Sequence, residues 1–236
     1  MIAVLKADDT IQMPVKVAFV DEAGSDAAGV SREAFTEFWN SFFCTSANGE
    51  DVRVPALCPE YGLEEWQAVG RILVKGFSDH KVFPLKLAPA FFIALMFGEE
   101  AVLPEELLDS FFLYLSDSDR QVLQLAMSGQ LSDDDKEVFE DILDQEGCHS
   151  ILQMEQVRLV VLQMAHKFLI LKSSYALEAM RHIVRERLCN KFLNVNSIKT
   201  MCSELKPTPK KVRDLLLALP ETREQNQAFR FLTQFI

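Results

Sequence analysis

The residues of this chain that could do chemistry are scattered rather than grouped. Three consecutive aspartates, Asp133 to Asp135, offer carboxylate oxygens to a cation. A calcium loop needs oxygen ligands at alternate positions, a glycine at its sixth position and a glutamate at its twelfth, and this segment lacks that pattern. Ser132 precedes the run, so we predict a helix start whose acidic first turn complements the helix dipole. We therefore expect no metal site and no cofactor.

The cysteines and histidines do not form a recognisable catalytic set. Cys148 and His149 are adjacent, but neighbouring side chains seldom face one another, and nucleophile–base pairs usually come from separate elements. His166 falls in an apolar helical segment and is interpreted as a core or edge residue. The five cysteines are odd in number and widely spaced, which fits reduced thiols better than disulfides or a zinc site. With no phosphate-binding glycine loop or nucleophile motif either, we expect no catalytic residue in this chain.

Composition and charge limit the partners. The net charge is −11, with 28 acidic and 10 basic residues in 1–150 but 7 acidic and 14 basic residues in 151–236. An acidic body repels phosphates, so no nucleic-acid partner is expected. The longest apolar run, Leu87 to Phe97, is shorter than the roughly 20 residues of a membrane span. We predict a cytoplasmic or nuclear protein with no membrane partner, in which the basic segment either meets an acidic partner or neutralises the acidic half.

The spacing of apolar residues, prolines and capping residues predicts a mainly α fold with a small β component (α+β). Alternation and β-branched residues predict one strand at Pro14 to Val20. The apolar segment Ile151 to Leu171 is predicted to be the central buried helix. The other helices are predicted to start at Ser31, to span Leu63 to Phe77, to start near Pro89 and Pro104, at Ser116 or Ser118 and at Ser132, to span Tyr175 to Phe192 and Asn196 to Leu205, to start at Thr208, and to run from Glu221 into Ile236.

Two ordered blocks carry a family resemblance. The first, Val17 to Phe43, reads VAFVDEAGSDAAGVSREAFTEFWNSFF and resembles the opening of the HECT domain of ubiquitin ligases. Its strand, acidic turn and aromatic helix fit, and the family motif is matched at Asp26, Gly29, Arg32 and Glu33. Ala28 stands where the family has the first glycine of a pair.

The second block, Val69 to Phe92, reads VGRILVKGFSDHKVFPLKLAPAFF. It is similar to the family's Gly-Arg helix and the Pro-Leu segment after it, with Gly70 and Arg71 at the motif positions. Val74 stands where the family usually has glycine. Because charges near a helix interface need partners, we expect Arg32 and Glu33 to form structural ion pairs close to the Gly70–Arg71 helix.

The resemblance implies an N-lobe of a HECT-type ubiquitin-protein transferase, clear over residues 14–95 and divergent and helical over 103–236. Later pieces of the chain are similar to the G2/M phase-specific ubiquitin ligase group. Such a lobe docks a ubiquitin-conjugating enzyme and relays ubiquitin to a cysteine in a separate C-terminal lobe, which is expected after Ile236. Cys189 and Cys202 lack the family's Thr-Cys context, so this chain alone is expected to be inactive.

The family's strand-rich docking subdomain should fall near Leu103 to Ser150, but this stretch is predicted to be helical. Aromatic side chains often anchor interfaces, so the candidate partner-binding residues are Leu107, Phe111, Phe112, Tyr114 and Leu115. The alternative role for the same five is the core, because they recur at helical spacing. The alternative function is a non-enzymatic helical protein-interaction module.

Overall fold

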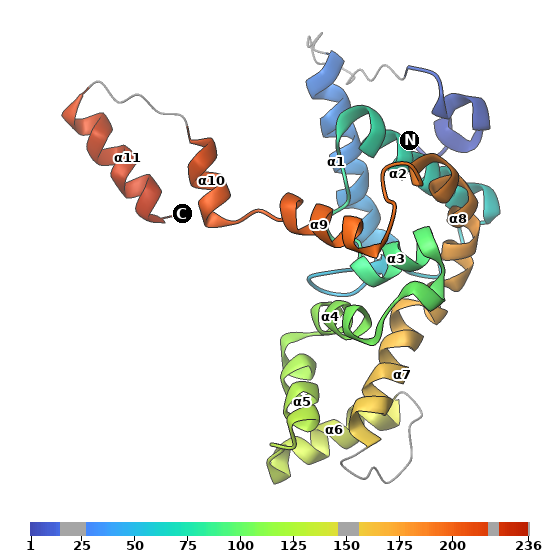
Figure 1. The fold of residues 1–236 in the computed structure, drawn as a ribbon, viewed down its shortest axis with the longest axis vertical. Coiled ribbons are helices and arrows are strands. Elements are labelled where there is room, and N and C mark those ends of the chain that lie inside the picture. Colours follow the sequence, from blue (N-terminus) through green and yellow to red (C-terminus); the bar gives the residue numbers. More distant parts are fainter. Residues whose placement is uncertain (15–26, 146–155, 217–221, 236) are drawn as a thin grey trace. The chain divides into compact units, whose positions relative to one another are not determined.

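A computed structural model describes residues 1–14, 27–145, 156–216 and 222–235 (Figure 1). Helices dominate this part of the chain, which confirms the predicted fold class of mainly α with a small β component. The chain divides into two units, Met1–Ile198 and Lys199–Ile236. The elements are η1 Val4–Lys6, η2 Asp8–Ile11, α1 Ala27–Thr45, β1 Ala47–Asn48, β2 Val54–Pro55, α2 Leu63–His80, α3 Pro89–Phe97, η3 Glu99–Ala101, α4 Pro104–Tyr114, α5 Asp117–Ser128, α6 Asp133–Gln145, α7 Val157–Leu169, η5 Leu171–Ser173, α8 Ser174–Leu188, α9 Val195–Leu205, α10 Pro209–Leu215 and α11 Arg223–Phe235.

Most helices begin where a proline or a capping side chain predicts a start. The Ser116 hydroxyl accepts a hydrogen bond from the Asp119 amide at 3.2 Å at the start of α5. Ser132 does the same for the Asp135 amide at 3.2 Å before α6. Proline is the first residue of α3, α4 and α10, where its missing N–H costs no helical hydrogen bond. The aspartate run at 133–135 is therefore a capped first turn, as the sequence predicts.

Two predictions about individual helices are wrong. Ser31 does not cap α1, because that helix begins at Ala27 and places both Gly29 and the buried Ser31 inside its first turns. The segment Ile151 to Leu171 is not buried all round: the described part, α7, buries one face and leaves Leu159 58% exposed. The predicted strand at Pro14 to Val20 lies almost entirely outside the described residues.

The core of the first unit is built on α2, α3 and α8. The helix that is apolar on every side is α3, whose residues 90 to 96 are all buried. On α2 the buried side chains include Trp66, Val69, Ile72 and Leu73, and this helix packs most extensively on α8. A buried helix of this kind is stabilised by about 25 cal/mol per Å² of apolar surface removed from water.

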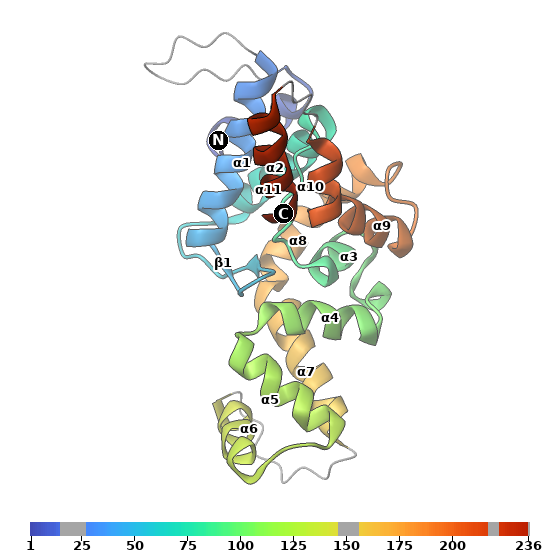
Figure 2. The same ribbon diagram turned by 90° about the vertical axis from the view of Figure 1, so that its left-hand side faces the viewer.

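The remaining helices of this unit lie toward its ends. Figures 1 and 2 both place α5, α6 and α7 toward one end and α1 and α2 toward the other. Helix α4 packs on α7, and α5 packs on α6 and α7. The short hairpin β1–β2 pairs Ala47 with Pro55 and Asn48 with Val54 in an antiparallel register. Its loop is tied to the end of α4, since the Glu50 amide donates to the Tyr114 carbonyl at 3.1 Å.

The second unit holds most of α9 together with α10 and α11. Thr208 and Thr222 accept hydrogen bonds from the amides of Lys211 and Gln225, each at 3.2 Å, and so begin α10 and α11. Among its described residues no side chain is buried. None of the helices in the described ranges has the length and apolar character needed to cross a membrane.

Candidate functional site

The family-like motif on α2 is part of the internal framework of the first unit. A Cβ atom added at Gly70 would lie 3.5 Å from the Cα of Met180, an ordinary van der Waals contact, so Gly70 faces α8 at a point where a small side chain would also fit. Arg71, one residue on, is 4% exposed. Lys75, one helical turn further, is 2% exposed. Burying two cationic groups is costly unless both are paired and hydrogen-bonded, so their partners matter.

Both cations hold the N-terminal segment in place. Arg71 donates from Nη1 to the carbonyls of Leu5 at 3.1 Å and Lys6 at 2.9 Å, and its Nη2 pairs with the Asp8 carboxylate. Lys75 donates from Nζ to the carbonyls of Ile11 at 3.2 Å and Met13 at 2.7 Å and to Asp79 at 3.0 Å. The motif therefore docks η1 and η2 onto α2, a role that we did not predict from the sequence.

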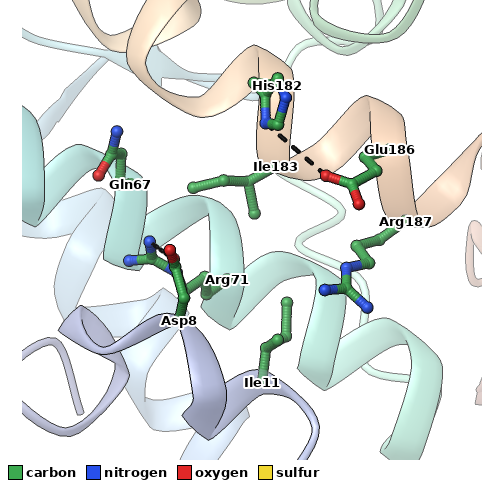
Figure 3. Close-up of a pocket in the computed structure, with 8 residues that line it drawn as sticks. All are labelled: Asp8, Ile11, Gln67, Arg71, His182, Ile183, Glu186 and Arg187. Atoms are coloured by element: carbon green, nitrogen blue, oxygen red, sulfur yellow. Dashed lines mark hydrogen bonds and ion pairs between the residues drawn. The ribbon is translucent and has the colours of Figure 1, made fainter.

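A polar cleft opens where η2, α2 and α8 meet (Figure 3). It encloses about 260 Å³. Its lining comes from three elements and consists of Asp8, Ile11, Gln67, Arg71, His182, Ile183, Glu186 and Arg187. The signal that could have located it is the run of His182, Glu186 and Arg187 on one face of a helix, opposite the motif arginine.

The cleft carries charges of both signs. Arg71 is engaged by Asp8, and the His182 ring, which is charged only when protonated, has Nδ1 3.7 Å from the Glu186 carboxylate. Arg187 has no ion pair to any residue of the described ranges, so its charge is available to a ligand. None of the lining side chains is a serine, threonine or cysteine nucleophile. The cleft can therefore bind a polar group of a partner, but its residues do not form a nucleophile–base pair.

The five candidate partner-binding residues on and after α4 divide into two groups. Leu107 is 8% exposed and Phe111 is fully buried, so these two belong to the core, which is the alternative role that their helical spacing predicts. Phe112, Tyr114 and Leu115 are half-buried. Tyr114 and Phe111 pack on Phe168 of α7, with ring centroids 5.6 Å and 5.8 Å apart. The surface left for a partner in this segment is thus narrower than the sequence pattern indicates.

The described part of the first sequence block, residues 27–43, forms most of α1. This helix packs against α2, with the rings of Phe42 and Trp66 6.1 Å apart in an edge-on contact. Arg32 and Glu33 are both exposed, and neither forms an ion pair within the described ranges. The predicted ion-pair role is therefore not formed among these residues, and Asp26 lies outside them.

The cysteines and histidines do not converge on a site. Burial raises the pKa of the Cys202 thiol, which lowers its thiolate fraction at neutral pH. Cys148 and His149 lie outside the described residues. His166 sits at the edge of α7, with Nε2 3.3 Å from the Glu99 carboxylate. Within the described ranges no three histidine, cysteine, aspartate or glutamate side chains are grouped closely enough to hold a metal ion.

Comparison with known proteins adds no relative: no protein-family model, no curated protein and no solved structure matches this chain.

Proposed function

We propose that this chain is the scaffold lobe of a HECT-type ubiquitin-protein ligase, which holds a ubiquitin-conjugating enzyme and does not itself form the ubiquitin thioester. The observation that carries the proposal is the placement of the second sequence block. Its Gly70 and Arg71 are buried on α2, where Gly70 faces α8 and Arg71 fixes the N-terminal segment. Proteins that share a fold need similar residues at the positions that hold it together, so structural roles for these motif residues support the resemblance.

The thioester part of the proposal rests on the chemistry of the thiols. A ligase cysteine must present a thiolate to the incoming thioester. Cys44 on α1 and Cys189 in the turn after α8 are exposed, while Cys58 and Cys202 are half-buried, and none of the four has the sequence context that the family uses. Incubation with ubiquitin-charged conjugating enzyme should therefore give no reductant-sensitive ubiquitin adduct. An adduct that one Cys→Ala substitution abolishes would overturn this part.

A panel of conjugating enzymes titrated against the labelled chain tests the docking part. We expect at least one dissociation constant below about 1 mM, a binding free energy stronger than about −4 kcal/mol. Phe112→Ser should weaken that binding at least about tenfold, because half-buried aromatic side chains anchor small interfaces. Leu85→Ser is the matched control, since Leu85 is 46% exposed in the connection before α3, away from this segment.

A non-enzymatic interaction module is the second candidate, and the course of residues 104–145 favours it. This stretch forms the helices α4, α5 and α6, whereas the resemblance implies a strand-rich docking subdomain there. If no conjugating enzyme binds below about 1 mM, the docking proposal fails and the helical module remains.

A further inference from the structure

Two lysines converge on Ser78, in the last turn of α2. Lys191, in the turn after α8, donates from Nζ to the Ser78 hydroxyl at 3.0 Å. Lys81, which caps the end of α2, donates from Nζ to the Ser78 carbonyl at 3.3 Å. The Lys191 ammonium also lies 5.0 Å from the centroid of the Phe77 ring. One lysine therefore contacts the hydroxyl of the half-buried Ser78 and the other contacts its carbonyl, so two cations from separate parts of the first unit lie beside this residue.

Among the described residues, these two cations are not neutralised by an ion pair. Within the described ranges neither Lys81 nor Lys191 forms an ion pair, and the nearby Asp79 carboxylate is engaged by Lys75 at 3.0 Å. Burial lowers the pKa of the Lys191 ammonium, the charge of Lys81 lowers it further, and Asp79 opposes both effects. Two like charges held together in this way are stabilised by an anion placed between them.

We propose that Ser78 is a phosphorylation site and that Lys81 and Lys191 clamp its phosphate. A protein kinase would transfer the γ-phosphoryl group of a nucleoside triphosphate to the Ser78 oxygen. The new O–P bond forms as the bond from the γ-phosphorus to the bridging oxygen breaks, and the hydroxyl proton passes to the kinase base. The product carries about −1.5 to −2 charge and three strong acceptor oxygens next to both ammonium groups.

A tethered phosphate suits this site better than a free one. Two lysines near a surface hold a dissolved anion weakly, but a phosphate on Ser78 is already at high effective concentration. The phosphate on Ser78 would also lie at the negative end of the α2 dipole. That end disfavours an anion in the last turn by about 0.3–1 kcal/mol unless cations compensate. The clamp would join the end of α2 to the connection between α8 and α9.

The chain offers a matched control in Ser128. It is the last residue of α5, exposed, with its hydroxyl donating to the Leu125 carbonyl at 3.0 Å, and the last turn of α5 holds no basic residue. Phosphoserine at 128 would therefore lie at the C-terminal, negative end of a helix dipole, as at Ser78, but without lysines to bind it.

The test uses the full chain made with phosphoserine at position 78 or at position 128. The second pKa of each phosphate, normally about 6, is read from the phosphorus NMR signal during a pH titration. We expect the value at 78 to lie at least about 0.5 below that at 128, because ammonium groups favour the dianion. Lys191→Gln, and separately Lys81→Asn, should each remove part of the difference. Phosphates that titrate alike at both positions would overturn the clamp.

Two further arms test the source of the phosphate. Inorganic phosphate titrated into the unmodified chain should half-saturate any effect on the Lys191 signals only above about 5 mM, since it lacks the tether. Saturation below that concentration would overturn the tethered site in favour of a dissolved anion. Mass spectrometry of the chain recovered from eukaryotic cells with phosphatases inhibited should find phosphate on Ser78, and its absence there would overturn the modification.

Discussion

At the scale of single residues, Arg71 and Lys75 show how a charge can be structural. Each lies almost fully inside the first unit, and most of their donors serve backbone carbonyls of the N-terminal segment. In a short 3₁₀ turn most carbonyls have no hydrogen-bond donor within the turn. The cationic side chains on α2 donate hydrogen bonds to them instead. The segment from Leu5 to Met13 is therefore held by hydrogen bonds from buried side chains as well as by its own apolar contacts.

Replacing Arg71 by methionine tests this role. The substitution keeps the apolar stem but leaves the carbonyls of Leu5 and Lys6 without their donor and Asp8 without its partner. We expect a loss of about 1–3 kcal/mol in the free energy of unfolding, with the small contribution of the exposed Asp8 discounted. Urea denaturation measures it, and Arg185→Met, on the exposed side of α8, should change it by less than about 0.5 kcal/mol. Equal effects of the two variants would contradict the structural role.

Gly49, in the loop of the hairpin, is a position that only glycine fits. Its φ angle is 121°, and an added Cβ would lie 2.3 Å from the Val52 carbonyl oxygen and 2.7 Å from Cδ2 of Tyr114. Gly49→Ala should destabilise the chain by about 2 kcal/mol or more, through both backbone strain and the clash with a backbone atom. Gly70→Ala is the control: its new Cβ meets Met180 at an ordinary 3.5 Å, so we expect a change within about 1 kcal/mol. Thermal unfolding of both variants would show the contrast, and a tolerated Gly49→Ala would refute the assignment.

At the scale of elements, the end of α2 carries a residue in an unfavourable conformation. Lys81 is the one non-glycine residue of the described ranges with a positive φ, at 59°. The left-handed region costs an ordinary residue roughly 1–2 kcal/mol, whereas glycine enters it freely. Lys81→Gly should therefore raise the free energy of unfolding by about 0.5–1 kcal/mol, as measured by urea denaturation. Lys86→Gly, at a residue without a positive φ, should give no such gain, and a destabilised Lys81→Gly chain would contradict the prediction.

Features that depend on contacts between residues close in the sequence were predictable, and features that depend on contacts between distant segments were not. Starts at Ser116, Ser132 and Thr208 were predictable because capping is local: the hydroxyl binds an amide three residues on. The identity of the central helix was not predictable. Both Ile151 to Leu171 and the α3 segment are apolar, and periodicity alone does not say which of the two the other helices surround. The anchoring of Asp8 by Arg71 joins positions 63 apart in the chain, and no local pattern encodes such a pair.

The candidate site was predicted only in part, for the same reason. The motif positions Gly70 and Arg71 were identified as structural residues, but the binding of Arg71 to the N-terminal segment was not predicted, and the cleft beside it depends on how α8 packs. On α4, helical spacing was equally compatible with core and interface, and the structure assigns Leu107 and Phe111 to the core. Whether Phe112, Tyr114 and Leu115 contact a partner stays a prediction, because half-burial fits either role.

At the scale of the molecule, the acidic and basic parts of the sequence meet inside the first unit. Arg158 lies 3.3 Å from Glu105, and His166 lies 3.3 Å from Glu99, so residues of the basic segment face the acidic half. Both contacts are partly or largely exposed, so an ion pair of this kind contributes only about 0–1 kcal/mol, and the histidine contact is an ion pair only when the ring is protonated. These contacts reduce the negative electrostatic potential around the acidic residues that they involve. A basic partner would be attracted mainly by the remaining acidic surface of residues 1–150, and its association rate should fall as salt screens that attraction.

The second unit, taken by itself, has helices without a core. On α11 the apolar residues Ala228, Phe231, Leu232 and Phe235 recur at helical spacing, yet Phe231 is 61% exposed and Phe235 is 90% exposed. Isolated helices shorter than roughly 12–15 residues are marginal in water, and α11 has 13 residues. The stability of α11 in the free chain should therefore be low.

Hydrogen exchange followed by mass spectrometry can measure this difference. In the free chain, amides of α11 should exchange within about tenfold of unstructured rates, while amides of the buried α3 should be slowed by at least about a thousandfold. Phe235→Ser should leave the thermal midpoint of the chain unchanged, because a side chain that exposed loses almost no apolar burial. Leu95→Ser, in the fully buried α3, is the contrasting variant and should lower that midpoint strongly. Protection of α11 equal to that of α3, together with a lowered midpoint for Phe235→Ser, would show that α11 is covered in solution.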